Sequence, residues 1–155
     1  MESTMVTTLT DFLEHGPAHV PLKKALTGIN PVIRNKKMGP QVASIWAELE
    51  HMRIAQEDIL QYMKTPGWRS PAWPEGYWPD SRIELNEQIW QATLKGFEQD
   101  LQETIRLVHD MDENLLDPLP HAAQHTYLRE ILLIIDHNAY HIGKIIDIRK
   151  ILGDW

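Results

Sequence analysis

The chain of 155 residues contains no cysteine, and this absence excludes several kinds of chemistry. Without a thiol it cannot form a disulfide framework, hold an iron–sulfur cluster or use a cysteine nucleophile. Basic residues are also scarce, because 15 Lys and Arg stand against 22 Asp and Glu, a net charge of −7. No basic run is present to neutralise phosphates, so nucleic acid and anionic membrane are poor candidates as the main partner.

Long apolar runs are missing as well. The longest aliphatic run, residues 131–135, is far too short to span a bilayer. Residues 1–13 lack the positively charged stretch that precedes the apolar part of a secretory signal. We therefore expect a cytoplasmic protein without a membrane segment. The length predicts a single domain over residues 1–155, large enough to bury a core without disulfides.

Apolar residues recur at helical spacing through most of the chain, and no stretch alternates as a strand does. The expected helical segments are residues 6–15, 21–29, 41–63, 80–117 and 125–152. Ser81 and Glu84 have the spacing of a capping box and mark the start of the fourth segment. Three long helices and an N-terminal helical part, joined by short connections, predict an all-α protein, an antiparallel four-helix bundle.

The connection from Thr65 to Asp80 is unusual because it carries four prolines and four aromatic residues, which are Trp68, Trp73, Tyr77 and Trp78. A solvated linker would not carry so much apolar area. We therefore expect a Trp/Pro-rich ordered loop between the second and third bundle helices, packed over one end of the bundle. It is either a hydrophobic plug that seals the core or the lid or wall of a binding pocket.

The last expected helix is apolar on two faces. Leu133 and Ile145 belong to one face, and Leu128 and Ile142 belong to a stripe nearly opposite. A helix that is apolar all round is buried all round. A homodimer contact through this helix would cover the second face, and burial by the N-terminal segments is the alternative.

Three pairs among the eight histidines lie four residues apart: 15/19, 121/125 and 137/141. On a helix such residues are about 40° apart and about 6 Å along the axis, so two imidazoles can bind one ion. Gly16 and Pro17 interrupt the first pair, and the second pair straddles a loop and a helix start. Only His137 and His141 lie in mid-helix, whereas His121 and His125 are expected at the surface.

A third ligand is expected from a facing helix, and His51 is the only other histidine in the middle of a long helix. Three imidazoles with an open fourth position are typical of a catalytic Zn²⁺, Ni²⁺, Fe²⁺ or Cu²⁺ site. The alternative is that these are structural or surface histidines. Glu48 and His51 also form one Glu-x-x-His step of the di-iron kind, but the second step that such a site needs is absent.

Several segments resemble the DinB-like superfamily of damage-inducible, YfiT-like four-helix-bundle proteins. The likeness is carried by residues 16–20 (GPAHV), 44–51 (SIWAELEH), 73–74 and 77–79 (WP and YWP), 126–130 (TYLRE) and 136–145 (DHNAYHIGKI). The family pattern has one His on the second long segment and a His-x-x-x-His-x-Gly-Gln-like step on the last helix. This chain fills all three His positions and has Lys144 where Gln is usual. The resemblance implies a metal site at His51, His137 and His141.

The resemblance also implies possible activities. Related families resemble thiol-dependent transferases and isomerases that use bacillithiol, mycothiol or glutathione, and other relatives have no known reaction. A metal-bound thiolate would let a chain without cysteine perform thiol chemistry with a low-molecular-weight thiol cosubstrate, and a metal-bound hydroxide would hydrolyse a small-molecule substrate. A non-enzymatic metal- or ligand-binding stress-response protein and a structural dimer module with vestigial histidines are the alternatives.

Residues around the expected site are assigned by their chemistry. A metal-bound His usually donates its other ring N–H to a carboxylate, and Glu48, one turn before His51, is preferred over Asp58 and Asp136. The candidate pocket-lining residues are His19, Trp73 and Trp78, whereas Trp46, Trp90 and Tyr140 are expected to pack away from the site.

Overall fold

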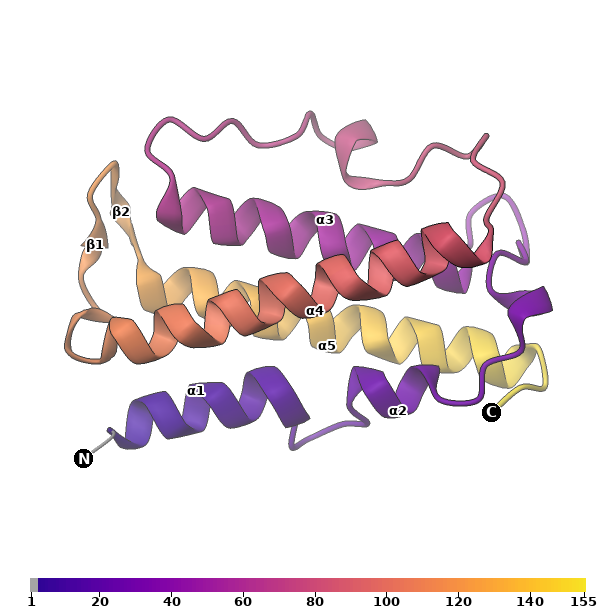
Figure 1. The fold of residues 1–155 in the computed structure, drawn as a ribbon, viewed down its shortest axis with the longest axis horizontal. Coiled ribbons are helices and arrows are strands. Elements are labelled where there is room, and N and C mark those ends of the chain that lie inside the picture. The colour runs from indigo at the N-terminus through magenta and orange to yellow at the C-terminus, as the bar shows by residue number, and fades with distance from the viewer. Residues whose placement is uncertain (1–2) are drawn as a thin grey trace.

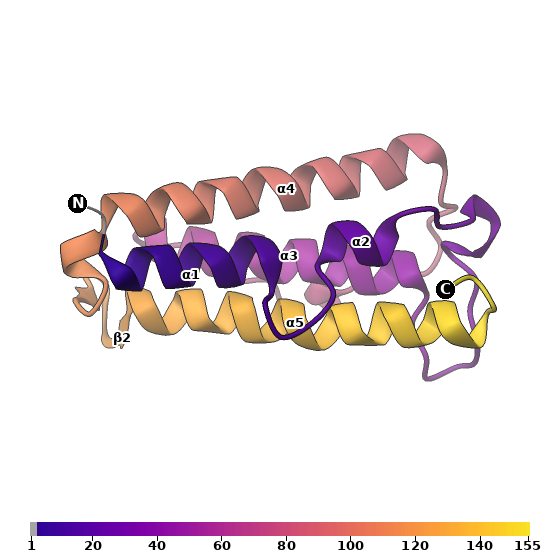
Figure 2. The same ribbon diagram turned by 90° about the horizontal axis from the view of Figure 1, so that it is seen from below.

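The computed structural model describes residues 3–155, which form a bundle of helices (Figure 1). The helices are α1 (Thr4–His15), α2 (Leu22–Leu26), α3 (Ile45–Lys64), α4 (Glu87–Asp110) and α5 (Tyr127–Ile151), with 3-10 turns at Pro31–Ile33, Glu75–Tyr77 and Asp112–Asn114. The short helices α1 and α2 follow one another along α4 and α5 and together fill the fourth position of the bundle (Figure 2). The expected all-α bundle is confirmed.

The direction of one helix pair differs from the antiparallel expectation, because α3 and α4 run the same way (Figure 1). Near the start of both helices the indole N–H of Trp46 donates to Thr93 Oγ1 at 3.2 Å, and further along both helices Lys64 pairs with Glu103. The cause is the Trp/Pro-rich connection, residues 65–86, which returns along the length of α3 before α4 begins. It therefore packs on the side of α3 and not over one end of the bundle.

Side-chain caps set the starts of the three long helices. The side chains of Ser44, Asn86 and Thr126 accept hydrogen bonds from backbone N–H groups in the first turns of α3, α4 and α5. The helix α4 therefore begins after Asn86, and the expected start at Ser81 is wrong because that residue lies in a turn. The helix α2 is also shorter than expected and ends at Leu26.

A small hairpin that the sequence did not indicate joins α4 to α5. Its strands, β1 (Pro118–Leu119) and β2 (Ala122–Thr126), pair antiparallel but are too short to show the alternation of a strand. His121 lies at the turn and is exposed, and its Nε2 is 2.7 Å from the carbonyl of Tyr62. His125 lies on β2 with Nδ1 3.0 Å from the hydroxyl of Tyr62.

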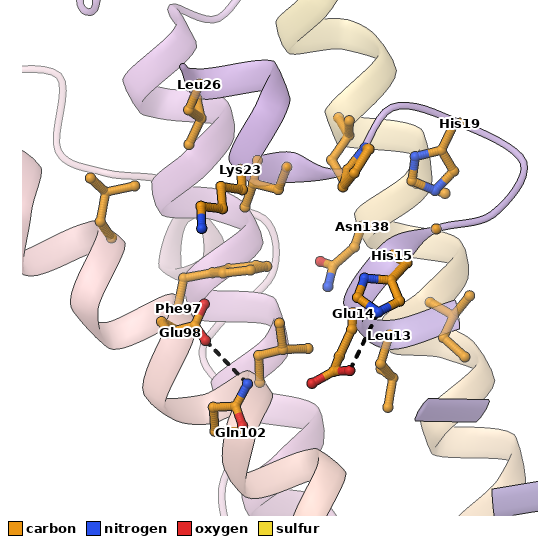
Figure 3. A pocket seen from close by; sticks show the side chains of 18 of the residues that line it. Leu13, Glu14, His15, His19, Lys23, Leu26, Phe97, Glu98, Gln102 and Asn138 are labelled. Atoms are coloured by element: carbon orange, nitrogen blue, oxygen red, sulfur yellow. Dashed lines mark hydrogen bonds and ion pairs between the residues drawn. The ribbon is translucent and has the colours of Figure 1, made fainter. Parts of the chain in front are cut away.

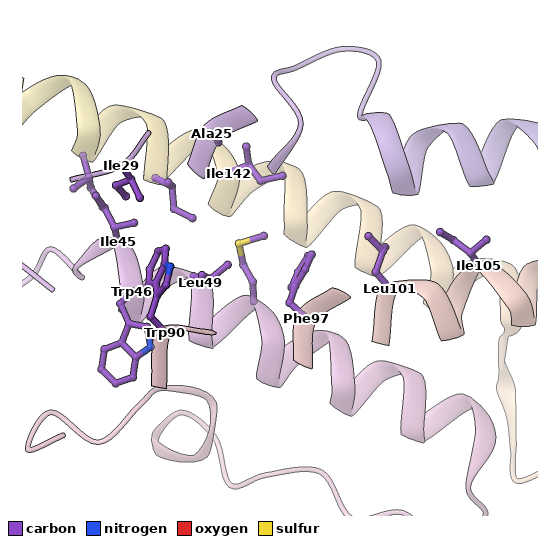
Figure 4. Packing of buried hydrophobic residues seen from close by; sticks show 13 residues of the cluster. Ala25, Ile29, Ile45, Trp46, Leu49, Trp90, Phe97, Leu101, Ile105 and Ile142 are labelled. Carbon is purple, nitrogen blue, oxygen red and sulfur yellow. The ribbon is translucent and has the colours of Figure 1, made fainter. Parts of the chain in front are cut away.

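The core consists of two clusters of buried apolar side chains along the bundle. Figure 4 shows the cluster that contains Ile45, Trp46, Leu49 and Trp90, in which both tryptophans are packed as expected. The other cluster contains Val6, Leu60, Val108, Ile131 and Ile134.

The helices α1 and α2 contact α5 and cover part of its second apolar face, on which Leu132 stays 48% exposed (Figure 2). Among the described residues, no helix has the length and apolar character needed to cross a membrane.

Candidate metal centre

Three histidines converge where α3 packs against α5. His51 comes from α3, and His137 and His141 come from successive turns of α5. Each offers one ring nitrogen, and these nitrogens all lie within 4.8 Å of one another, the one such group of three or more His, Asp or Glu in residues 3–155. His51 and His141 are buried and His137 is half-buried. The structure thus brings together the three residues that the sequence singled out.

The nitrogens that face one another are the Nε2 atoms. His137 Nε2 lies 3.0 Å from His51 Nε2. Two nitrogens bound to one tetrahedral zinc ion are about 3.3 Å apart, since each Zn–N bond is about 2.05 Å. The two Nε2 atoms, 3.0 Å apart, therefore need to move apart only slightly to bind an ion of this size.

The loop after α3 fixes the ring of His51. Its Nδ1 lies 2.7 Å from the backbone carbonyl of Tyr77. Because a carbonyl can only accept, Nδ1 carries the proton and the lone pair is left on Nε2. The indole of Trp78 stacks on the same ring, with centroids 4.1 Å apart and planes inclined by 4°. The Tyr77 carbonyl was not predicted, because a backbone group has no residue type to recognise.

Glu48 orients the second imidazole. Its side chain has no exposed surface, and Oε2 accepts a hydrogen bond from His141 Nδ1 at 2.6 Å. The other oxygen, Oε1, lies 2.7 Å from Lys144 Nζ. Glu48 was preferred from the sequence as a partner near His51, and the structure pairs it with His141 instead. Lys144, the position that departs from the family pattern, contacts the carboxylate that holds His141.

The charge states of the site favour a cation. Burial raises the pKa of Glu48, but hydrogen bonds from His141 and Lys144 outweigh it, so this pKa is lowered and the carboxylate is ionised. Burial, helped by neighbouring His141, lowers the pKa of His137 to about 4. Burial also lowers the pKa of His51. At neutral pH His51 and His137 are therefore neutral and present lone pairs, the form in which imidazole binds a metal.

The buried polar atoms give a test of fit for an ion. His137 Nδ1 is buried and has no hydrogen-bond partner among the described residues, so its ring is held only through the side that faces the other histidines. Its Nε2 lies 3.0 Å from His51 Nε2, which carries a lone pair, and two imidazole nitrogens that face each other in a buried place are costly unless they share a partner. A divalent transition metal supplies that partner, and three imidazole donors suit it. The residues present therefore fit an ion.

A cavity of about 640 Å³ lies beside the three histidines. Its aromatic wall consists of Trp73, Tyr77, Trp78 and Tyr140. Lys144 is the one cationic Lys or Arg among the lining residues. Tyr140 was expected to point elsewhere, and this expectation is wrong: its ring stands edge-on to His141, with centroids 4.9 Å apart.

Asp58 anchors the loop that forms this wall. The buried carboxylate accepts hydrogen bonds from the Trp68 indole N–H at 2.7 Å and from the Tyr77 hydroxyl at 2.6 Å. Burial and the bond to Asp58 raise the pKa of Tyr77 to about 12, so its hydroxyl keeps its proton. Trp73 is 74% exposed, and a plug that seals the core would bury it. The loop is thus a wall of the cavity, the second of the two expected roles.

His19 does not lie at this cavity. It lines a separate cavity, between the α1–α2 connection and the helices α4 and α5 (Figure 3). Of the three candidate lining residues, Trp73 and Trp78 therefore lie beside the histidine cluster and His19 does not. Asp136 also lines the cluster cavity but is exposed, and Glu48 is the carboxylate that contacts a ring of the cluster.

Comparison with known proteins identifies a family. A family model described as the DinB superfamily matches residues 22–145, most of the chain. The match begins with α2, extends into α5 and includes all three histidines. Searches of curated proteins and of solved structures found no match.

Proposed function

The chain belongs to the DinB superfamily, and on this premise we propose that it binds one divalent transition-metal ion through the Nε2 atoms of His51, His137 and His141. One observation carries the proposal, the convergence of three ring nitrogens from two helices within 4.8 Å. Zinc, nickel and iron all accept three imidazoles, so ligand type alone does not choose among them.

The fourth position of such an ion is free of protein ligands. Only three His, Asp or Glu residues meet at the described site, and the cavity lies beside them. When bound, the ion would act as a Lewis acid and lower the pKa of the water or thiol at that position. Around it, Glu48 holds the ring of His141, the Tyr77 carbonyl holds that of His51, and the aromatic wall gives a bound ligand an apolar surface.

For the activity, we propose an enzyme that transfers a low-molecular-weight thiol to a small electrophile in this cavity. One feature supports it: the cavity offers an aromatic wall to an apolar electrophile. Because the chain has no cysteine, the thiol would come from the cosubstrate. Metal-dependent hydrolysis and non-enzymatic binding of a metal or ligand in a stress response are the competing functions, and the second test below separates them.

The metal proposal is tested by the metal content of the purified protein after loading with zinc, nickel or iron and removal of free ion. We expect about one ion per chain in the wild type and in His121→Ala, a matched histidine on the hairpin, and less than a tenth as much in His137→Ala. A wild-type content below about 0.1 ion per chain with all three metals, with the protein folded by circular dichroism, refutes the proposal.

The activity is tested on the loaded protein with 1-chloro-2,4-dinitrobenzene and, separately, glutathione, cysteine, bacillithiol or mycothiol. We expect thiol consumption above the buffer rate in wild type and in His121→Ala, and none above it in His137→Ala. Equal background rates with every thiol refute the transferase. Release of nitrophenol from p-nitrophenyl acetate by wild type alone would then assign hydrolysis, and its absence would assign non-enzymatic binding.

A further inference from the structure

A second cavity, of about 810 Å³, opens where the N-terminal helical part is interrupted (Figure 3). The helix α1 ends at His15, the following Gly16 turns the chain away with a positive φ of 50°, and α2 begins only at Leu22. Residues of α1, α2, α4 and α5 line the space at this interruption. The resulting volume is within the range of small-molecule sites, about 300–1,000 Å³.

This cavity lies across α5 from the histidine cluster. Asn138, Ala139 and Ile142 line it, whereas His137 and His141 line the cavity of the candidate metal centre. Because each residue turns an α-helix by about 100°, the two sets are centred roughly 130° apart around α5. The second cavity therefore has its own walls and does not share the candidate metal ligands.

The walls are apolar inside and polar at the rim. Phe97 and Leu101 of α4 are buried, and Leu13 and Leu26 line the same cavity. Figure 3 labels Phe97, Leu13 and Leu26 among the lining side chains. Apart from Asn138, the polar lining residues belong to the rim. Gln102 is half-buried, and the others are exposed: Glu14, His15, His19, Lys23, Thr27, Gln91, Lys95 and Glu98. Such a cavity favours a ligand that is mostly apolar.

Asn138 is the polar group inside. Its side chain is 9% exposed and projects from α5 toward Phe97 (Figure 3). Gln56 Nε2 donates to the Phe97 carbonyl at 2.8 Å, so Gln56 Oε1 faces Asn138 and accepts from its Nδ2 at 2.9 Å. These two hydrogen bonds assign the Asn138 amide: its nitrogen Nδ2 faces Gln56, and its oxygen Oδ1 is the other atom.

The other end of the amide, Asn138 Oδ1, is buried and accepts no hydrogen bond from any described residue. A buried acceptor without a partner is rare and costly, and each case calls for an explanation. The cavity supplies one, because a donor on a molecule bound there would complete the amide.

We propose that this second cavity binds a small, largely apolar molecule that carries one hydroxyl donor, such as an alkylphenol or a comparable alcohol. The hydroxyl donates to Asn138 Oδ1, and the apolar part packs against Phe97 and Leu101. A phenol ring with a short alkyl chain occupies only part of about 810 Å³, so larger members of the class also fit. The site needs no metal and is independent of the function proposed above.

The test is calorimetric titration of the full-length, metal-loaded protein with 4-propylphenol and with its methyl ether, 4-propylanisole, which has the same apolar part but no donor. We expect the phenol to bind the wild type about tenfold more tightly, the factor that one net hydrogen bond of about 1.4 kcal/mol gives. Asn138→Leu should bind the two probes equally. Ala139→Phe and Leu26→Trp, which fill the cavity from two different helices, should bind neither.

Three results would overturn the proposal: equal affinity of the wild type for both probes, no binding of either, or unchanged binding in both cavity-filling variants. Tyr140→Ala alters only the cavity beside the histidines and should bind the phenol as wild type does. A loss there would place the probe at that cavity and refute the assignment. If Asn138→Leu does not fold, nuclear Overhauser contacts in the wild type decide: the propyl chain must contact the Phe97 ring and not Trp78.

Discussion

Replacing Glu48 by Gln is expected to weaken metal binding about tenfold while leaving the bundle folded. The Glu48 carboxylate is fully buried and serves two donors, His141 Nδ1 at 2.6 Å and Lys144 Nζ at 2.7 Å. A Gln side chain has one acceptor oxygen. If that oxygen faces His141, the hydrogen bond persists. Its acceptor is then neutral, and a hydrogen bond to a neutral acceptor is about half as strong as one to a carboxylate.

The size of the effect follows from the same contacts. Removing the partner of a metal-bound His typically costs 10- to 100-fold in affinity, and a neutral amide of the same shape belongs at the mild end, about tenfold or about 1.4 kcal/mol. The amide nitrogen would face Lys144, whose side chain is 38% exposed and is free to turn to water. Glu48→Ala, which removes the acceptor altogether, is therefore expected near the hundredfold end.

The assay is competition for zinc against a chromophoric chelator at pH 7.5. Glu50→Gln is the matched control: it makes the same change on the same helix, but Glu50 accepts from Arg53 and Thr93 and bonds no histidine. Its zinc affinity should stay within about twofold of wild type. Wild-type affinity in a folded Glu48→Gln protein would refute the role of Glu48. An equal loss in Glu50→Gln would show a general charge effect instead.

Two further predictions concern the loop and pH. Tyr77→Phe removes a hydroxyl that donates to buried Asp58 at 2.6 Å, so the free energy of unfolding in urea should fall by about 1–2 kcal/mol. Tyr140→Phe, at a residue 65% exposed, should change it by less than about 0.5 kcal/mol, and equal values would contradict the anchoring role. In metal-free protein the pKa of His137 is about 4 and that of His51 is below its usual 6.5, so the unfolded chain binds more protons in this window. The free energy of unfolding should therefore keep its maximum above pH 6.5 and fall as the pH is lowered toward 4. His137→Ala should make this fall shallower, and His15→Ala, at an exposed residue, should not. A wild-type free energy that does not change with pH would refute the lowered pKa values.

Local patterns in the sequence predicted what is local in the structure. The helical period identified the long helices, and the spacing of His137 and His141 placed two imidazoles on one face of α5. The direction of α4 is not local, because it depends on the course of residues 65–86, and aromatic content alone does not say whether a loop covers an end or a side. Ser81 and Glu84 have capping-box spacing, but the helix is capped by Asn86 instead.

Contacts between elements explain the remaining differences. Pairing Glu48 with His141 instead of His51 depends on how α3 is rotated against α5, which no residue spacing reports. His19 follows the interruption after α1 and so faces the other cavity. Tyr140 was within reach of the sequence: it lies three residues after His137, about 60° around the helix, and so shares the outer part of the same face.

The division of the three histidines between two helices has a consequence for biosynthesis. His51 and His137 are 86 residues apart in the chain, and translation makes α3 well before α5. A nascent chain that ends before α5 presents one of the three imidazoles, and an isolated α5 presents two. Neither segment alone encloses an ion, so acquisition of the metal would have to wait until α5 docks on α3. Incorporation of metal into ribosome-bound chains of increasing length would then mark the moment at which these two helices pack.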